Sequence, residues 1–189
     1  MSTLYVDSIQ PKTTGQAITV ATTNQTGHVL QVKHFQLTTM VNEAYPTTDT
    51  DQAITNFVVN ITPKSTSSIM KIEANMMFEW ANNTWNTMWF FYRDTTKLGN
   101  TQASPGNRKI GISPSLPSHG NTTPDNDSTP EFASLTYFDA PQTTSAINYK
   151  LGVNSNGTNM LFINRTVGDG NSVAYDRGVS FISVTEIGG

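Results

Sequence analysis

Apolar and polar side chains alternate strictly through one segment in the middle of this chain. Between Ile69 and Trp80, the apolar residues share one parity: Met70, Ile72, Ala74, Met76, Phe78 and Trp80. The polar residues of this segment share the other parity: Lys71, Glu73, Asn75 and Glu79. A period of two is typical of a β-strand that buries one face. The segment therefore predicts a strand whose even-numbered side chains enter a core.

Shorter apolar runs, separated by Pro, Gly, Asn and Ser, predict further strands on both sides of this one. They cover residues 28–41, 57–61, 85–93, 132–137, 145–153, 160–165 and 177–187. About eight strands with turns at short intervals are typical of a sandwich, jelly roll or barrel. No window has the periodicity of a substantial helix. We therefore expect an all-β fold, an antiparallel β-sandwich of jelly-roll type.

The first of these strands has an irregular apolar pattern. Its phase shifts between Val32 and Phe35, which predicts a β-bulge near Lys33 and His34. A loop is expected after this strand, over residues 42–51, because Pro46 and two acids interrupt the pattern.

The two ends of the chain differ in character. The last strand, residues 177–187, is rich in β-branched residues and is followed by two glycines, so we expect it to pair inside a sheet and to leave no tail. Residues 1–26 form a Thr- and Gln-rich arm with a short apolar piece at Leu4, Tyr5, Val6 and Ile9. This arm is either a docking or strand-exchanging segment or the first hairpin of the domain. The β domain then covers residues 27–189.

Composition excludes several classes of function. The net charge of -3 and the scattered basic residues give no footprint for nucleic acid. There is no cysteine for a disulfide, a zinc site or a thiol nucleophile. The chain starts without a signal peptide and has no run of about 20 apolar residues, so we expect no membrane insertion. Charged residues are only 13% of the chain, and β-strands with so few charges are prone to pair with other chains, which favours a symmetric oligomer.

Several segments, taken in order, resemble a domain of tailed-bacteriophage virion proteins, particularly those of marine phages. The matching segments are residues 27–32, 61–68, 91–96, 139–141, 144–150, 163–166 and 177–187, and residues 2–9 are similar to the start of phage fibre and appendage proteins. The resemblance covers most of the chain from Gly27 onward. It implies a homotrimeric, jelly-roll-like structural protein of the virion, assembled in the cytoplasm of the host bacterium. It implies no catalytic residues and no cofactor.

Candidate metal ligands have simpler explanations. His28 and His34 lie on one predicted strand about 20 Å apart, so they cannot bind one metal within a subunit. Three copies of one histidine could meet on a three-fold axis, but polar surface is the favoured interpretation. Residues 49–51 and 125–127 resemble fragments of calcium loops without the distal glutamate, and we interpret both as solvated turns. We therefore expect no metal site.

Candidate ligand contacts lie in the aromatic segment and in the long loop that follows. Trp80, Trp89 and Phe91 are expected in the core, whereas Trp85, in a turn between polar residues, is the candidate for an exposed contact with a sugar. The Pro-rich stretch 99–130, which contains the second candidate, His119, is long enough to be a functional loop.

The sequence has no nucleophile elbow and no catalytic triad, so we do not expect an enzyme. The preferred interpretation is a structural component of a tailed-phage virion, of the tail-fibre or receptor-binding type. Its expected partners are two further copies, other tail or capsid proteins and a host surface glycan. The alternatives are a capsid decoration or head-fibre protein and, less favoured, a polysaccharide-degrading tailspike.

Overall fold

The computed structural model describes residues 26–45, 49–81, 84, 86–100, 106–115, 128–156 and 159–189. Within these ranges the chain forms eleven strands and no helix, so the expected all-β fold is confirmed. No helix in the described ranges is therefore available to cross a membrane. The strands are β1 (Val29–Leu37), β2 (Val41–Tyr45), β3 (Gln52–Ile61), β4 (Ile69–Trp80), β5 (Met88–Arg93), β6 (Thr96–Lys97), β7 (Ser113–Pro114), β8 (Glu131–Asp139), β9 (Ile147–Asn154), β10 (Asn159–Ile163) and β11 (Ser180–Ile187).

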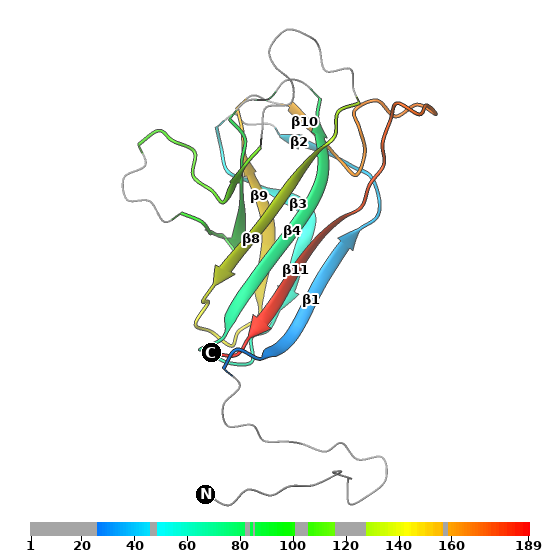
Figure 1. The fold of residues 1–189 in the computed structure, drawn as a ribbon. Helices are drawn as coiled ribbons and strands as arrows, with labels where there is room; N and C mark the ends of the chain where they lie inside the picture. The colour runs from blue at the N-terminus through cyan, green and yellow to red at the C-terminus, as the bar shows by residue number, and fades with distance from the viewer. Residues whose placement is uncertain are drawn as a thin grey trace, which may run out of the picture.

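The strands form two antiparallel sheets that pack face to face as a sandwich (Figure 1). In the first sheet β4 is central, with β8 along one edge and β11 followed by β10 along the other. This sheet continues outward to β1 beside β11 and to β2 beside β10. In the second sheet β9 lies between β3 and β5, and the short strands β6 and β7 pair with β5. From β2 to β5 and from β8 to β10 the chain crosses between the sheets at each connection, as in a jelly roll.

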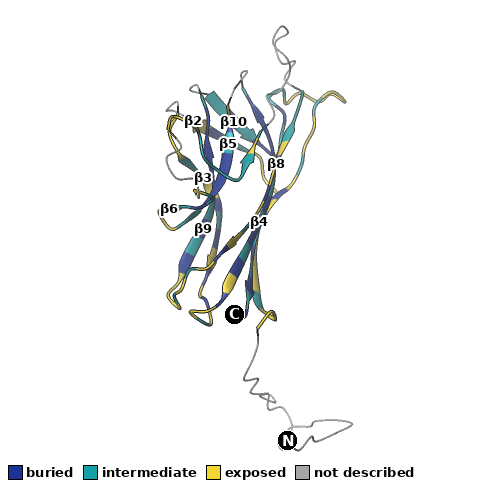
Figure 2. Cartoon of the chain, turned by 60° about the vertical axis from the view of Figure 1, so that its left-hand side comes forward, coloured by how far each residue is buried: buried dark blue, intermediate teal, exposed yellow. Residues whose placement is uncertain are grey.

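The core lies between the two sheets, where the strands carry their buried residues (Figure 2). β4 supplies the expected face: its even-numbered side chains, from Met70 to Trp80, are all buried. Trp89 and Phe91 of β5 are also fully buried, and the rings of Trp89 and Phe78 meet across the sheets with centroids 4.8 Å apart. The prediction that Trp80, Trp89 and Phe91 belong to the core is confirmed.

The predicted bulge near Lys33 and His34 is wrong. Pairing between β1 and β11 is continuous from Gln31 to Leu37, and the irregularity lies between Val29 and Gln31. Val32 and Phe35 differ in phase because they lie on opposite faces of a regular strand: Phe35 packs on the core, whereas Val32 is exposed. The rule that apolar residues share one face failed because the outer face of this sheet also carries apolar side chains.

Two further expectations about strand limits need correction. The long first strand ends at Leu37, and residues 42–51, expected as a loop, contain most of β2. Glu43 of β2 explains why this polar segment is a strand: its buried carboxylate accepts hydrogen bonds from the amide and the hydroxyl of Thr55, at 2.7 Å and 2.8 Å. A polar side chain is thereby satisfied inside the fold.

Glu79 lies on the predicted polar side of β4, yet it is buried. Its carboxylate accepts hydrogen bonds from the Thr129 amide at 2.8 Å and from the Val167 amide at 2.6 Å. Because both donors belong to connections between strands, this one side chain anchors two loops. The alternation of β4 predicts the side to which Glu79 points, but not that loops cover it.

The closing strand β11 is hydrogen-bonded on both sides, to β1 and to β4, so its predicted place inside a sheet is confirmed. Its start is held by Asn164, a buried residue with a positive φ of 62° just after β10. The Asn164 side-chain amide donates to the carbonyl oxygens of Leu37 and Thr39, at 2.7 Å and 2.9 Å, and its oxygen accepts from the Ser180 hydroxyl at 2.5 Å. These bonds join β1, β10 and β11.

The other end of the sandwich is held by two buried carboxylates. Asp139, after the core-facing residues of β8, accepts from Arg93 at 2.9 Å and from the Tyr149 hydroxyl at 2.7 Å, and so connects the two sheets. Burial and the Asp139 hydrogen bond raise the pKa of Tyr149. Glu186 of β11 accepts from Gln31 and from the Lys64 amide, at 2.5 Å and 2.7 Å. Burial alone would raise the pKa of Glu186, but these hydrogen bonds outweigh it and lower that pKa.

Candidate functional site

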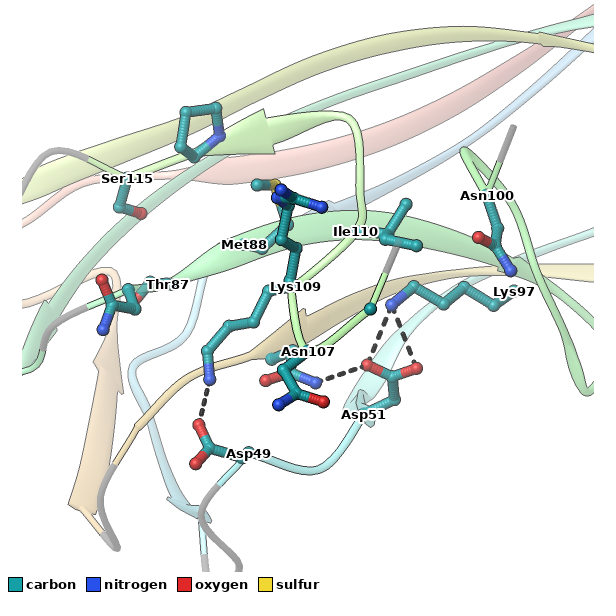
Figure 3. A pocket seen from close by; sticks show the side chains of 15 residues that line it. Asp49, Asp51, Thr87, Met88, Lys97, Asn100, Asn107, Lys109, Ile110 and Ser115 are labelled. Atoms are coloured by element: carbon teal, nitrogen blue, oxygen red, sulfur yellow. Dashed lines mark hydrogen bonds and ion pairs between the residues drawn. The ribbon is translucent and has the colours of Figure 1, made fainter. Parts of the chain in front are cut away.

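A pocket of about 1050 Å³ lies at one end of the second sheet (Figure 3). It is lined where β3 begins, where β5 begins and where β9 ends, together with the segment 106–115. The described chain ends lie at the opposite end of the sandwich, where the Gly27 amide donates to the Gly188 carbonyl at 2.6 Å. The molecule therefore carries its pocket and its chain ends at opposite poles.

One wall of the pocket is an ion pair supported by an aromatic ring. The Lys97 ammonium lies 2.9 Å and 3.0 Å from the two carboxylate oxygens of Asp51. The same ammonium lies 4.0 Å from the centre of the Phe90 ring, in a cation–π contact. Phe90 can occupy this place because Gly152, its partner on β9, has no side chain: a Cβ there would lie 2.5 Å from the ring. Gly152 thus positions Phe90, and Phe90 and Asp51 position Lys97.

A second ion pair, between Asp49 and Lys109, closes the neighbouring wall (Figure 3). Asp49 has a positive φ of 56°, and its amide donates to the Ser155 carbonyl at 2.8 Å, so the backbone fixes the direction of its carboxylate. Tyr45 supports the same turn, because its hydroxyl donates to the Thr50 carbonyl and accepts from the Ser155 amide. Burial raises the pKa of Tyr45, so this hydroxyl keeps its proton at neutral pH.

The segment 106–115 enters the pocket because it adds to the edge of β5. The Ile112 amide donates to the Trp89 carbonyl at 2.8 Å, and the Ser115 amide donates to the Thr87 carbonyl at 3.1 Å. The Trp89 indole N–H also donates to the Ser115 hydroxyl. Part of the Pro-rich stretch 99–130 is thus ordered as β7 and brings Asn107, Arg108 and Lys109 to the pocket.

The pocket is suited to a polar ligand with many hydroxyl groups. Four asparagines line it: Asn86, Asn100, Asn107 and Asn154. Asn154 donates to Asp51 at 2.7 Å, whereas its own buried side-chain oxygen accepts no hydrogen bond within the described part of the chain. Among the described residues, three cationic side chains and two carboxylates line the pocket, an excess of one positive charge. Side-chain amides can both donate to and accept from sugar hydroxyls, whereas lysine and arginine only donate to them and carboxylates only accept from them.

The site residues predicted from sequence can be compared with the pocket only through their described neighbours. Trp85 and His119, the two candidate ligand contacts, lie outside the described residues, as do Leu4, Tyr5, Val6 and Ile9 of the candidate docking arm. Asn86, the chain neighbour of Trp85, lines the pocket, as do residues of the segment 106–115, which is part of the Pro-rich stretch 99–130.

The acidic segment 49–51, interpreted as a solvated turn, has a more specific role: both its aspartates pair with lysines that line the pocket. Within the described ranges, no three His, Asp or Glu side chains lie close enough together to hold a metal ion. Sequence reasoning missed Lys97 and Lys109, which are 46 and 60 residues from their partners along the chain. No local pattern connects residues at such separations.

The sequence matches no family model and no curated protein. Among solved structures, the chain is similar to a structure of infectious bursal disease virus strain Gx, at 12% identity over 85% of this chain and with a TM-score of 0.35. It is similar to the VP2 subviral particle of infectious bursal disease virus at 12% identity over 84% of the chain and with a TM-score of 0.33. The chain spans 43% and 42% of the length of those two chains. At these values the likeness assigns neither a family nor a function.

Proposed function

We propose that this chain is a non-enzymatic structural component of a tailed-phage virion, an appendage of the tail-fibre or receptor-binding type that acts as a homotrimer. The observation that carries the proposal is the position of the pocket. A hydrogen-bonding cavity lies at one pole, and the described chain ends, from which an arm could attach the domain to the particle, lie at the other. The resemblance of the sequence to phage virion domains supports the same assignment.

The ligand of the pocket is a saccharide of the host surface. Its hydroxyl groups would bind to the asparagines and to the carboxylate oxygens of Asp49 and Asp51. The excess positive charge favours saccharides that contain acidic sugar units over cationic ones. Binding needs no bond to be broken, so the pocket requires no general acid or nucleophile.

Two measurements test this assignment. Purified full-length protein is expected to bind to an array of bacterial surface polysaccharides, and Asp51→Asn should weaken that binding at least about tenfold because it removes the charge that holds Lys97. Asp169→Asn is the matched control, since Asp169 also forms ion pairs, with Arg165 and Arg177, but does not line the pocket. Equal binding by both variants, or release of reducing ends from the bound polysaccharide, contradicts the proposal.

Position on the particle is tested with antibodies raised against the purified protein. Labelling of tail fibres or tail appendages in electron micrographs of whole virions is the expected result. Label on DNA-filled heads that lack tails would instead identify a capsid decoration or head-fibre protein and overturn the tail assignment.

A further inference from the structure

The outer face of the first sheet is unusual because it carries several large exposed apolar side chains among polar ones. The face is formed by β8, β4, β11 and β1, which lie side by side toward the viewer in Figure 1. Of the nine large apolar side chains that are exposed among the described residues, six lie here: Val29, Val32, Ile69, Phe132, Phe138 and Phe181. Exposed fractions of 63% for Phe132, 58% for Phe138 and 53% for Val32 place these side chains in solvent. Large apolar side chains that gather on one exposed face and are bordered by polar residues mark candidate protein–protein interfaces.

The strand register shows that these side chains form one surface. Phe138 of β8 lies opposite Lys71 of β4, Lys71 lies opposite Thr185 of β11, and Thr185 lies opposite Val32 of β1. Four strands spaced by about 4.8 Å, over the length of β8, give a face of roughly 19 by 30 Å. Two such faces would bury on the order of 1,100 Å² together, which reaches the roughly 1,000 Å² needed for a specific interface.

The charges of the face match those of a second copy. Lys71 and Glu73 point to this side of β4 and pair with each other at 2.8 Å, so the face is neutral although the chain carries a net charge of -3. A copy of the same face is therefore not repelled, and Lys71 of one subunit can pair with Glu73 of the next. A strongly charged partner would bring charges that the apolar side chains around this ion pair could not compensate.

We infer that copies of this chain pack together through the outer face of β8, β4, β11 and β1. The interface buries Phe132, Phe138, Phe181 and Val32, and the pocket on the second sheet remains open in the assembly. The same surface explains why Val32 breaks the apolar phase of its strand: it belongs to a second buried face rather than to the core.

Light scattering after size-exclusion chromatography of the full-length protein tests the inference. Wild type at micromolar concentration is expected to elute with a multiple of the chain mass. Phe138→Asp combined with Phe181→Asp should weaken association on the order of 100-fold or more and give a monomer. Val173→Asp is the matched control, since Val173 is an exposed apolar residue in the loop before β11, and it should leave the mass unchanged.

Circular dichroism and thermal unfolding establish whether the double variant is folded. If it is not, Phe138→Ala with Phe181→Ala replaces it, with an expected weakening of about tenfold. A monomeric wild type, or a double variant that keeps the wild-type mass, overturns the interface. Loss of association on deletion of residues 1–25 without any effect of the face variants also overturns it. The inference names the surface of the proposed homotrimer and so rests on the proposed function: a monomeric wild type refutes both, whereas an oligomer that the face variants leave intact refutes this surface alone.

Discussion

Asn164 offers the most stringent test of how this sandwich is held together. Its side chain makes three hydrogen bonds, to Leu37, Thr39 and Ser180, and is almost completely buried. Each buried hydrogen bond contributes about 0.5–1.5 kcal/mol net, so removal of the side chain should cost about 3 kcal/mol in free energy of unfolding. Asn164→Gly removes these bonds while it tolerates the positive φ of 62°.

Asn164→Ala removes the same bonds and adds backbone strain, because a β-carbon is disfavoured at positive φ by about 1 kcal/mol. The alanine variant should therefore be less stable than the glycine variant by that amount. This order is the reverse of the usual one, in which glycine is the more destabilising of the two. The comparison separates the contribution of the side chain from that of the backbone at one position.

Urea unfolding followed by tryptophan fluorescence measures the free energy of unfolding of wild type and of both variants. The subunit concentration is kept fixed, because association shifts the apparent stability. Gln142→Gly is the control, since Gln142 also has a positive φ, of 54°, but is an exposed residue of the connection between β8 and β9. Its stability should be unchanged or slightly higher. A glycine variant of Asn164 within about 0.5 kcal/mol of wild type would refute the role of its hydrogen bonds, and an alanine variant more stable than the glycine variant would refute the strain argument.

Two further predictions concern Glu186 and Gly152. Because hydrogen bonding lowers the pKa of Glu186 below its usual 4.5, its carboxylate stabilises the fold above that pH, and this contribution is lost as the pH falls through the folded-state pKa. Glu186→Gln should cost about 1–3 kcal/mol in free energy of unfolding at pH 7 and less at pH 3, whereas Asp176→Asn, at an exposed residue, should show a small effect at both pH values. A cost of Glu186→Gln that is as large at pH 3 as at pH 7 contradicts the role of the charge. Gly152→Ala places a Cβ 2.5 Å from the Phe90 ring and should cost about 1–3 kcal/mol, or a fall in Tm of roughly 2–4 °C per kcal/mol by calorimetry. Gly170→Ala, whose Cβ would meet Tyr175 at 3.4 Å, should leave Tm nearly unchanged, and equal shifts in the two variants would refute the close packing at Gly152.

Much of the fold could be predicted because β4 combines a buried face with a polar one. The limits predicted for this strand are those observed, and its neighbours follow from the same alternation. β1 was harder to interpret, since apolar side chains lie on both of its faces and alternation no longer identifies the core. Only tertiary structure shows that Val32 and Phe35 belong to different surfaces.

The candidate site was less accessible to sequence analysis. Its ion pairs join Asp51 to Lys97 and Asp49 to Lys109, and the members of each pair are brought together by the pairing of β3 with β9 and of β9 with β5. The length of the Pro-rich stretch predicts a functional loop. The part of it that lines the pocket is ordered by β-pairing to β5, which two residues, Ser113 and Pro114, are too few to predict.

The buried carboxylates have a structural role that fits the proposed function in recognition. Glu43, Glu79 and Glu186 each accept hydrogen bonds from backbone amides of segments outside their own strands, so a chain with few charges uses acids to anchor its connections. A general acid needs a raised pKa and access to substrate. Glu186 has a lowered pKa and is fully buried, and Asp49 and Asp51 in the pocket are engaged by lysines. Carboxylates held in this way keep loops and pocket walls in fixed positions, which is what selective binding of a saccharide requires.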